Sequence, residues 1–193
     1  MWSAYNRKLA SHPVITKSLT VATLGFVGDV GSQRLESWLD RRAGRTPHGY
    51  SVERSLRVAA FGLALSGPLN HFWYGALEKM VKGSGTRANV TKVVLDQTIF
   101  APVILTAFFT AMPVLEGQSL ETGLDNAKSH LIPALKLNYF VWPAAQAINF
   151  RYVPLQHRVG YVSVILCFWN AVISYLHHKP HDETDANVTK AIE

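Results

Sequence analysis

The chain has 193 residues, enough for one domain with a sizeable core, and its formal net charge is +6. Hydrophobic residues make up 48% of it and charged residues only 17%, against about 25% in a typical soluble protein. A single Cys167 excludes an internal disulfide and a cysteine metal cluster, and no zinc finger or RNA-recognition motif directs the positive charge toward nucleic acid.

The amino-terminal segment 2–11 predicts a short amphipathic helix that ends near Pro13. No acidic residue precedes Asp29, and this basic composition resembles a mitochondrial targeting sequence. Because the segment runs directly into hydrophobic sequence, we expect it to remain uncleaved and to lie at the membrane interface.

The first half of the chain predicts three long helices. The helix over 14–38 is the least hydrophobic of them, because it contains charged and amide side chains. A basic loop over 40–49 leads to a helix over 52–81, in which we expect a kink at Gly67-Pro68. A glycine-rich connector precedes a third helix over 88–115, whose prolines are tolerable inside a membrane bundle.

The second half predicts an amphipathic helix over 120–136, followed by the apolar segment Leu137–Phe150. That segment alone is too short to span a bilayer comfortably. It either re-enters the membrane or extends the preceding helix into one kinked rod. Pro154 then separates it from a final helix over 156–178.

Three runs contain no Asp, Glu, Lys or Arg: Val58–Leu77, Gln97–Leu115 and Val159–Leu176. An apolar run of roughly 18 or more residues is long enough to cross a bilayer as a helix. We therefore expect an all-α, polytopic transmembrane bundle of four to five membrane helices plus the short amphipathic helix; the alternative is a soluble all-α core. The membrane domain would cover 1–179, and a polar tail would cover 180–193.

The helix over 14–38 carries a face of small and polar residues at three- and four-residue steps, which allows close helix packing. These residues are Ser18, Ala22, Gly25, Asp29 and Ser32, with Gly28 and Gly31 beside them. A carboxylate in a spanning helix is costly and normally faces a protein interior or water. Asp29 is therefore either a structural ion-pair partner or a residue of a solute pathway.

Ten polar side chains are candidates for a pathway or for an interhelical polar network. They are Asp29, Gln33, Arg54, Arg57, His71, Asp96, Gln97, Asn149, Arg151 and Arg158. Arg57 shares a helix face with small residues and His71, so we expect it to pair with Asp29. Lys92 and Asp96 stand four residues apart, a spacing at which opposite charges can meet. The alternative for the arginines is contact with lipid headgroups at helix ends.

No pattern in the sequence supports catalysis or a metal or cofactor site. His71 has no second ligand at a suitable spacing, and we find no nucleophile, phosphate-binding or metalloprotease motif. We therefore expect a protein that is not an enzyme.

Several ordered motifs between Tyr5 and Lys179 resemble the Mpv-seventeen/peroxisomal-membrane-protein-twenty-two family. The amino-terminal ones are Pro13 with Thr16, Gly28-Asp29, Gln33, Arg54, Arg57, Gly67-Pro68, His71, Trp73, Tyr74 and Leu77. The later ones are Asp96-Gln97, Pro102, Trp142-Pro143, Gln146, Asn149-Phe150, Val153-Pro154, Arg158 and Trp169-Asn170. The stretch 147–158 is most similar to the fungal, stress-inducible mitochondrial members. Ile173-Ser174 and the loop with Arg41, Arg42 and Arg45 depart from the family pattern.

The resemblance implies an integral membrane protein of an organelle, with several spans and no enzyme activity. Members of the family are described as water-filled, weakly selective channels of the mitochondrial inner or peroxisomal membrane, and are linked to mitochondrial homeostasis and metabolic stress. We expect a mitochondrial inner-membrane protein that gives small metabolites a pathway, with the peroxisomal membrane as the alternative compartment. A non-conducting protein that organises membrane complexes is the alternative function. The expected partners are anionic lipids, a small solute and, in one arrangement, further copies of the chain, but not nucleic acid.

Overall fold

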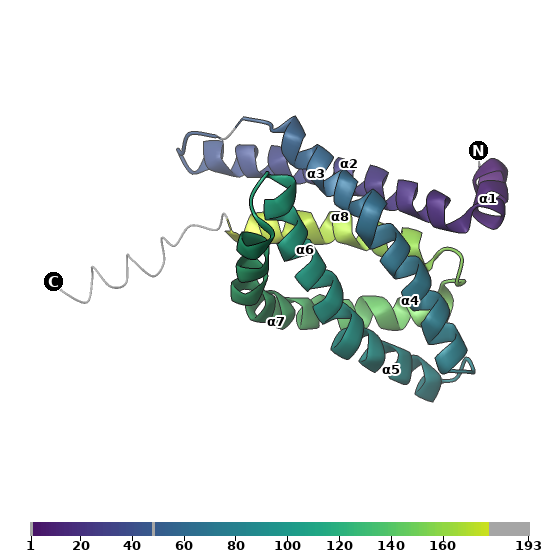
Figure 1. The fold of residues 1–193 in the computed structure, drawn as a ribbon. Helices are drawn as coiled ribbons and strands as arrows, with labels where there is room; N and C mark the ends of the chain where they lie inside the picture. Colours follow the sequence, from purple (N-terminus) through teal and green to yellow (C-terminus); the bar gives the residue numbers. More distant parts are fainter. Residues whose placement is uncertain (1, 48, 178–193) are drawn as a thin grey trace.

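The computed structural model describes residues 2–47 and 49–177, with side chains placed as far as residue 170. In this part of the chain all regular elements are helical and no strand occurs, as the sequence predicts. The helices are α1 (Trp2–Ser11), α2 (Pro13–Arg42), α3 (Val52–Phe61), α4 (Gly67–Met80), α5 (Thr86–Leu95), α6 (Ala101–Leu115), α7 (Leu120–Tyr152) and α8 (Arg158–His177) (Figure 1). The predicted tail over 180–193 lies outside the described residues.

The short helix α1 confirms the predicted amphipathic start. Leu9 is its buried residue, whereas Trp2 is exposed. The Tyr5 hydroxyl lies 3.2 Å from the Thr20 hydroxyl and thereby holds α1 against α2. Pro13 opens α2, a position where its missing N–H leaves no helical hydrogen bond unmade.

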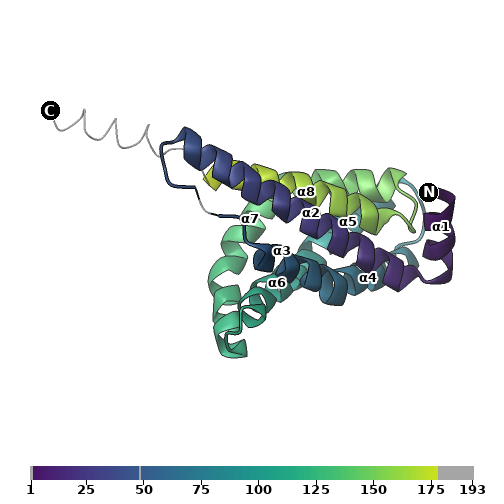
Figure 2. The same ribbon diagram turned by 90° about the horizontal axis from the view of Figure 1, so that it is seen from above.

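Helix α2 lies at the centre of the helix contacts, because it packs against α1, α3, α4 and α8. It continues past the predicted end at residue 38 to Arg42, and Gly44 then turns the chain with a φ of 70°. Figure 2 shows α2 and α8 side by side, and α3 and α4 pack along the neighbouring side of α2.

Two π-helical turns interrupt the predicted helices over 52–81 and 88–115. Gly62–Ser66 connects α3 to α4, and Asp96–Phe100 connects α5 to α6. Each turn directly precedes a helix whose second residue is proline. Proline cannot donate to the carbonyl one turn earlier and its ring crowds that carbonyl, so a wider turn accommodates it. The irregularity expected near Gly67-Pro68 is therefore present as a π turn.

Helix α7 settles the alternatives for the apolar segment Leu137–Phe150. The segment continues the preceding helix, so α7 is one rod that contains Pro133 and Pro143. Ser119 caps its start, because the Ser119 hydroxyl accepts a hydrogen bond from the Thr122 N–H at 3.1 Å. The chain leaves α7 at Tyr152 and turns before α8.

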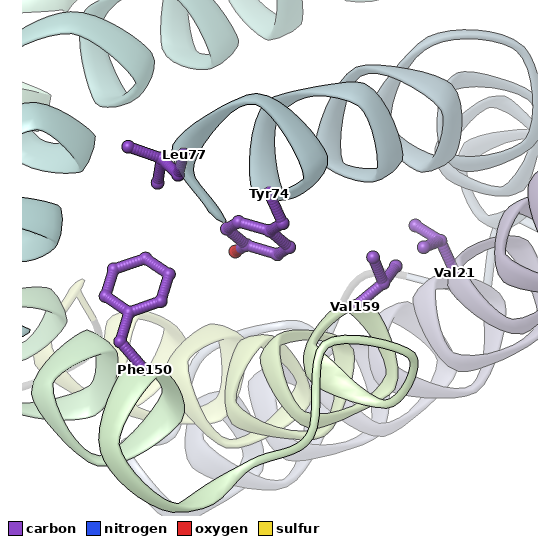
Figure 3. Close-up of a cluster of buried hydrophobic side chains, with 5 residues drawn as sticks. All are labelled: Val21, Tyr74, Leu77, Phe150 and Val159. Atoms are coloured by element: carbon purple, nitrogen blue, oxygen red, sulfur yellow. The ribbon is translucent and has the colours of Figure 1, made fainter. Parts of the chain in front are cut away.

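The apolar core is small and joins four helices. It consists of Val21 from α2, Tyr74 and Leu77 from α4, Phe150 from α7 and Val159 from α8 (Figure 3). Tyr74 and Phe150 meet edge to face, with ring centroids 5.8 Å apart.

The distribution of side chains differs from that of a soluble bundle. Among the described residues, more polar and charged side chains than apolar ones are buried. Large apolar side chains point outward instead, including Phe140 with 84% of its surface exposed and Phe168 with 68%. Water disfavours such a surface, whereas lipid tails solvate it.

Two continuous helical stretches are long and apolar enough to cross a membrane, Pro13–Arg42 and Thr86–Leu115, each of 30 residues. The second contains the predicted run Gln97–Leu115. The first is the helix that the sequence marked as the least hydrophobic. The prediction of four to five spans goes beyond these two helices and remains a prediction.

We expect the protein to stay in the membrane pellet when its organelle is extracted with alkaline carbonate. The exposed apolar side chains would lose contact with lipid on release, at roughly 25 cal/mol for each Å² returned to water. Immunoblotting of the pellet and supernatant measures this. Release together with a peripheral marker protein would contradict the membrane-spanning interpretation.

Candidate functional site

The first buried polar network surrounds the carboxylate of Asp29 on α2. Its Oδ2 atom accepts hydrogen bonds from the Gln33 amide and from the Ser55 hydroxyl, both at 2.7 Å. Its Oδ1 atom lies 2.8 Å from Nε of Arg54. Gln33 follows Asp29 by one helical turn, whereas Ser55 and Arg54 come from the start of α3. The network therefore joins α2 to the beginning of α3.

Two further contacts close this network. The Arg54 guanidinium donates to both carboxylate oxygens of Glu36, at 2.9 and 3.2 Å. The Gln33 side-chain oxygen accepts from the backbone N–H of Ser51 at 2.8 Å, and the Ser51 hydroxyl in turn caps α3. The Asp29 carboxylate is thus satisfied by one cation and two neutral donors, an arrangement that stabilises a buried charge.

The predicted pair between Asp29 and Arg57 is wrong. Arg57 extends to the end of α6, where its Nη2 atom lies 3.2 Å from the Glu116 carboxylate. The register of α2 against α3 explains the difference. Position 25 of α2 lies against Val58, so Asp29, one turn later on α2, lies level with the first turn of α3. Arg54 is the arginine at that level.

The second buried network surrounds Asp96, in the π turn between α5 and α6. Its Oδ1 atom accepts from the Trp73 indole N–H at 2.8 Å. Its Oδ2 atom accepts from the amides of Gln97 and Gln146, both at 2.9 Å. All three donors are neutral. The expected approach of Lys92 does not occur, because the Lys92 ammonium binds Glu78 at 2.8 Å instead.

Asparagine side chains extend the second network toward α7. The Asn138 amide donates to the Gln97 side-chain oxygen, and the Asn149 amide donates to the Gln146 side-chain oxygen, both at 2.8 Å. Asn149 is fully buried, yet its own Oδ1 atom has no hydrogen-bond partner. The network therefore contains two acceptor groups. The Asp96 carboxylate already accepts three hydrogen bonds, whereas the Asn149 Oδ1 atom accepts none.

A third cluster gathers positive charge at one end of the bundle. Glu78, at the end of α4, accepts from Lys92 and from Arg158, both at 2.8 Å. Arg158 also donates to the Val153 carbonyl at 3.1 Å and lies over the Phe150 ring at 5.4 Å. Both cations are buried, whereas the Glu78 side chain is 39% exposed.

The remaining candidates lie apart from the two networks. His71 Nδ1 lies 3.2 Å from the ammonium of Lys17, at the start of α2. Arg151 donates to the Ser84 carbonyl and lines a shallow pocket with Asn89 and Tyr152. The structure thus groups six of the ten candidates. Asp29, Gln33 and Arg54 share the first network, and Asp96, Gln97 and Asn149 share the second.

Sequence reasoning did not identify Lys17, Ser55, Glu78 or Gln146 as partners in these groups, and it paired Lys92 with Asp96 rather than with Glu78. Gln146 carried the clearest signal, because it is an amide inside an otherwise apolar segment. Ser55 carried none, since serine is common at the first turn of a helix. Among the described residues, no group of three metal-ligating side chains lies together.

The chain is similar in sequence to a known protein family over most of its length. A sequence profile of the Mpv17 / PMP22 family matches residues 97–174. A relative named "Mitochondrial inner membrane protein Mpv17" from Xenopus laevis is 36% identical over 93% of this chain and 98% of its own length. "Protein sym-1" from Neurospora crassa is 37% identical over 91% and 98%, and "Peroxisomal membrane protein 2" from Bos taurus is 34% identical over 90% and 88%. No solved structure matches the chain.

Proposed function

The chain belongs to the Mpv17/PMP22 family, and on that premise we propose that it gives small polar metabolites a pathway across the mitochondrial inner membrane. We choose the mitochondrial inner membrane as the compartment because the 36% identical Xenopus laevis relative is named as a protein of that membrane. The peroxisomal membrane is the alternative, because the 34% identical Bos taurus relative is a peroxisomal membrane protein. In this role the protein supports mitochondrial homeostasis under metabolic stress, among anionic lipids, without an enzymatic step and without nucleic acid.

The Asp96 carboxylate carries this proposal. It lies in the interior of a helix long enough to cross a membrane, and its hydrogen-bond donors are neutral groups of Trp73, Gln97 and Gln146. An ionisable side chain at membrane depth is costly and commonly marks the route of an ion or polar solute. A purely structural role would be served at lower cost by an amide.

The surroundings of Asp96 support the same proposal. The unpaired Oδ1 atom of Asn149 offers a second acceptor in the same network. The π turn that contains Asp96 also favours a functional role, because such turns occur frequently at functional sites. Polar side chains of α4, of the π turn Asp96–Phe100 and of α7 meet here, so a passing solute could exchange its hydrogen bonds for those of the protein.

We test the proposal with purified protein in planar bilayers and ion-substitution recordings. The Asp96→Asn substitution removes one negative charge, worth roughly 2 kcal/mol to a cation about 8 Å away at an effective dielectric constant of about 20. Cation permeability should therefore fall by up to about 30-fold. Asp125→Asn is the matched control, because Asp125 is exposed and pairs only with exposed Lys128 in the described part of the chain. Equal reversal potentials for the two variants would contradict a pathway at Asp96.

A non-conducting protein that organises membrane complexes is the second candidate, and the Asp29 network favours it. There the carboxylate, Arg54 and Glu36 satisfy one another, which is the arrangement of a structural clamp between helices. Wild-type protein that produces no conductance in the bilayer recordings, while remaining folded, would select this candidate.

A further inference from the structure

Within residues 2–47 and 49–170, whose side chains the structure describes, the buried Lys17 ammonium has no carboxylate partner. Only 5% of the residue is exposed, although lysine is almost never buried unless it is paired. Its one hydrogen-bond contact in the described part of the chain is the imidazole Nδ1 atom of His71, at 3.2 Å. A protonated lysine has three donors, so this contact leaves hydrogen-bonding capacity unused.

His71 leaves the charge of Lys17 uncompensated. Since the Nδ1 atom of His71 faces the Lys17 ammonium, it acts as the acceptor and the ring proton is on Nε2. The pair is therefore positively charged and rich in N–H donors, with no acceptor left on either side chain.

The surrounding charges reinforce this positive character. Arg158 is close enough for its charge to repel that of Lys17. Arg158 and Lys92 share the single carboxylate of Glu78. Lys17, Lys92 and Arg158 are thus three buried cations, and Glu78 is the one carboxylate that the described residues pair with any of them, which leaves an excess of two positive charges. An additional anion would relieve this repulsion.

The structure also provides space for such an anion. Lys17 lines a cleft of about 440 Å³ together with Pro154, Leu155 and Gln156, the residues between α7 and α8. The start of α2 and the α7–α8 connection, which carry these lining residues, lie at the same end of the bundle, next to α1 (Figure 1). This is the same end as the exposed basic residues of α1, Arg7 and Lys8.

We infer that this cleft binds a phosphate group, with the Lys17 ammonium as its principal ligand. Lysine binds phosphate as a compact point charge, and the net positive cluster behind it raises the local concentration of anions. Two sources share this chemistry: a free phosphate-bearing solute, and the headgroup of an anionic lipid at the bundle end.

The first experiment uses the full wild-type chain in a maltoside detergent, which contains no phosphate. Inorganic phosphate is titrated against sodium chloride at matched ionic strength, and the thermal unfolding midpoint is measured. In parallel, mixed micelles with phosphatidylglycerol are compared with mixed micelles of phosphatidylcholine. A saturable rise with inorganic phosphate identifies a free phosphate as the ligand. A rise with phosphatidylglycerol alone identifies a lipid headgroup. No rise in either titration overturns the inference.

The second experiment locates the binding site. Lys17→Met keeps the length of the side chain without its charge and should weaken binding about tenfold or more, because a charged hydrogen-bond donor is lost. Lys17→Arg should retain most of the affinity. Lys8→Met is the matched control, since Lys8 is exposed at the same end of the bundle. Equal loss in Lys8→Met and Lys17→Met would overturn the site, as would unimpaired binding in Lys17→Met. Binding is measured here without conductance, so a negative result leaves the proposed pathway untouched.

Discussion

Replacing Asp29 with alanine should destabilise the bundle by about 2 kcal/mol, because the buried Ser55 hydroxyl loses its acceptor and the Gln33 amide loses one of two. The lost contact with Arg54 adds little to this destabilisation, because the Arg54 side chain is 42% exposed and keeps its contacts with Glu36. The free energy of unfolding in detergent micelles, from denaturant titration followed by circular dichroism, measures the effect.

A double-mutant cycle identifies the partner of Asp29. Asp29→Ala combined with Arg54→Ala should give a coupling energy of about 1 kcal/mol, since the two side chains share one network but Arg54 is partly exposed. The same cycle with Arg57→Ala is the matched control, because Arg57 lies one turn further on the same helix but contacts Glu116. Its effects should add to within about 0.5 kcal/mol. Stronger coupling to Arg57 than to Arg54 would contradict the register of α2 against α3.

Replacing Gly67 with alanine should destabilise the protein by about 2–3 kcal/mol, at the upper end of the range for overpacked sites. A Cβ atom at position 67 would lie 2.5 Å from the Cα atom of Ser18. The obstacle is backbone rather than a flexible side-chain end, so α2 and α4 would have to move apart. That movement would also disturb Val21 and Tyr74 in the core.

Gly75→Ala is the control for this substitution. Gly75 belongs to the same helix, α4, and a Cβ atom there would meet nothing within 4 Å. Alanine favours the helix by about 0.5–1 kcal/mol over glycine, so this variant should be slightly stabilised. Unfolding midpoints of the two variants in the same detergent test the contrast. A Gly67→Ala protein as stable as Gly75→Ala would show that the two helices are not in backbone contact.

The order and type of the helices could be predicted from the sequence because they depend on local pattern. Charge-free runs, Pro13 and Pro154 placed most elements to within a few residues. The choice between a re-entrant segment and a rod at Leu137–Phe150 could not be made in this way. It depends on whether α7 finds packing partners along its whole length, and α5, α6 and α8 come together around it only in the folded bundle.

The pairing of charges was harder to predict because it depends on helix register. A helical wheel places Arg57 and His71 on one face, but the π turn Gly62–Ser66 is wound less tightly than an α-helix and so changes the angle between them. Arg57 consequently faces Glu116, whereas His71 faces Lys17. The small residues of α2 predicted helix packing better than the charges predicted ion pairs. Positions 25 and 28 lie against Val58 and Cys167, as close packing requires, although Gly31 faces open space.

Lys17 shows a different limit of sequence reasoning. A lysine near the start of a membrane helix is usually a headgroup contact whose ammonium reaches the interface. Nothing in the local sequence distinguishes it from Lys8. Only the fold brings His71, Arg158 and the α7–α8 connection around it, and so turns an ordinary position into a buried one.

The far end of α2 offers a way to determine how the protein is oriented. Residues 30–42 continue beyond the level where Asp29 meets α3, which at 1.5 Å per residue adds about 20 Å of helix. Figure 1 shows this end of α2 and its return toward α3 reaching past the start of α3. Arg41 and Arg42 are exposed there. Trypsin added to the outside of sealed vesicles would cut after Arg41 or Arg42 only if this end of α2 faces the outside. The fragment pattern would therefore report which compartment this end of α2 faces.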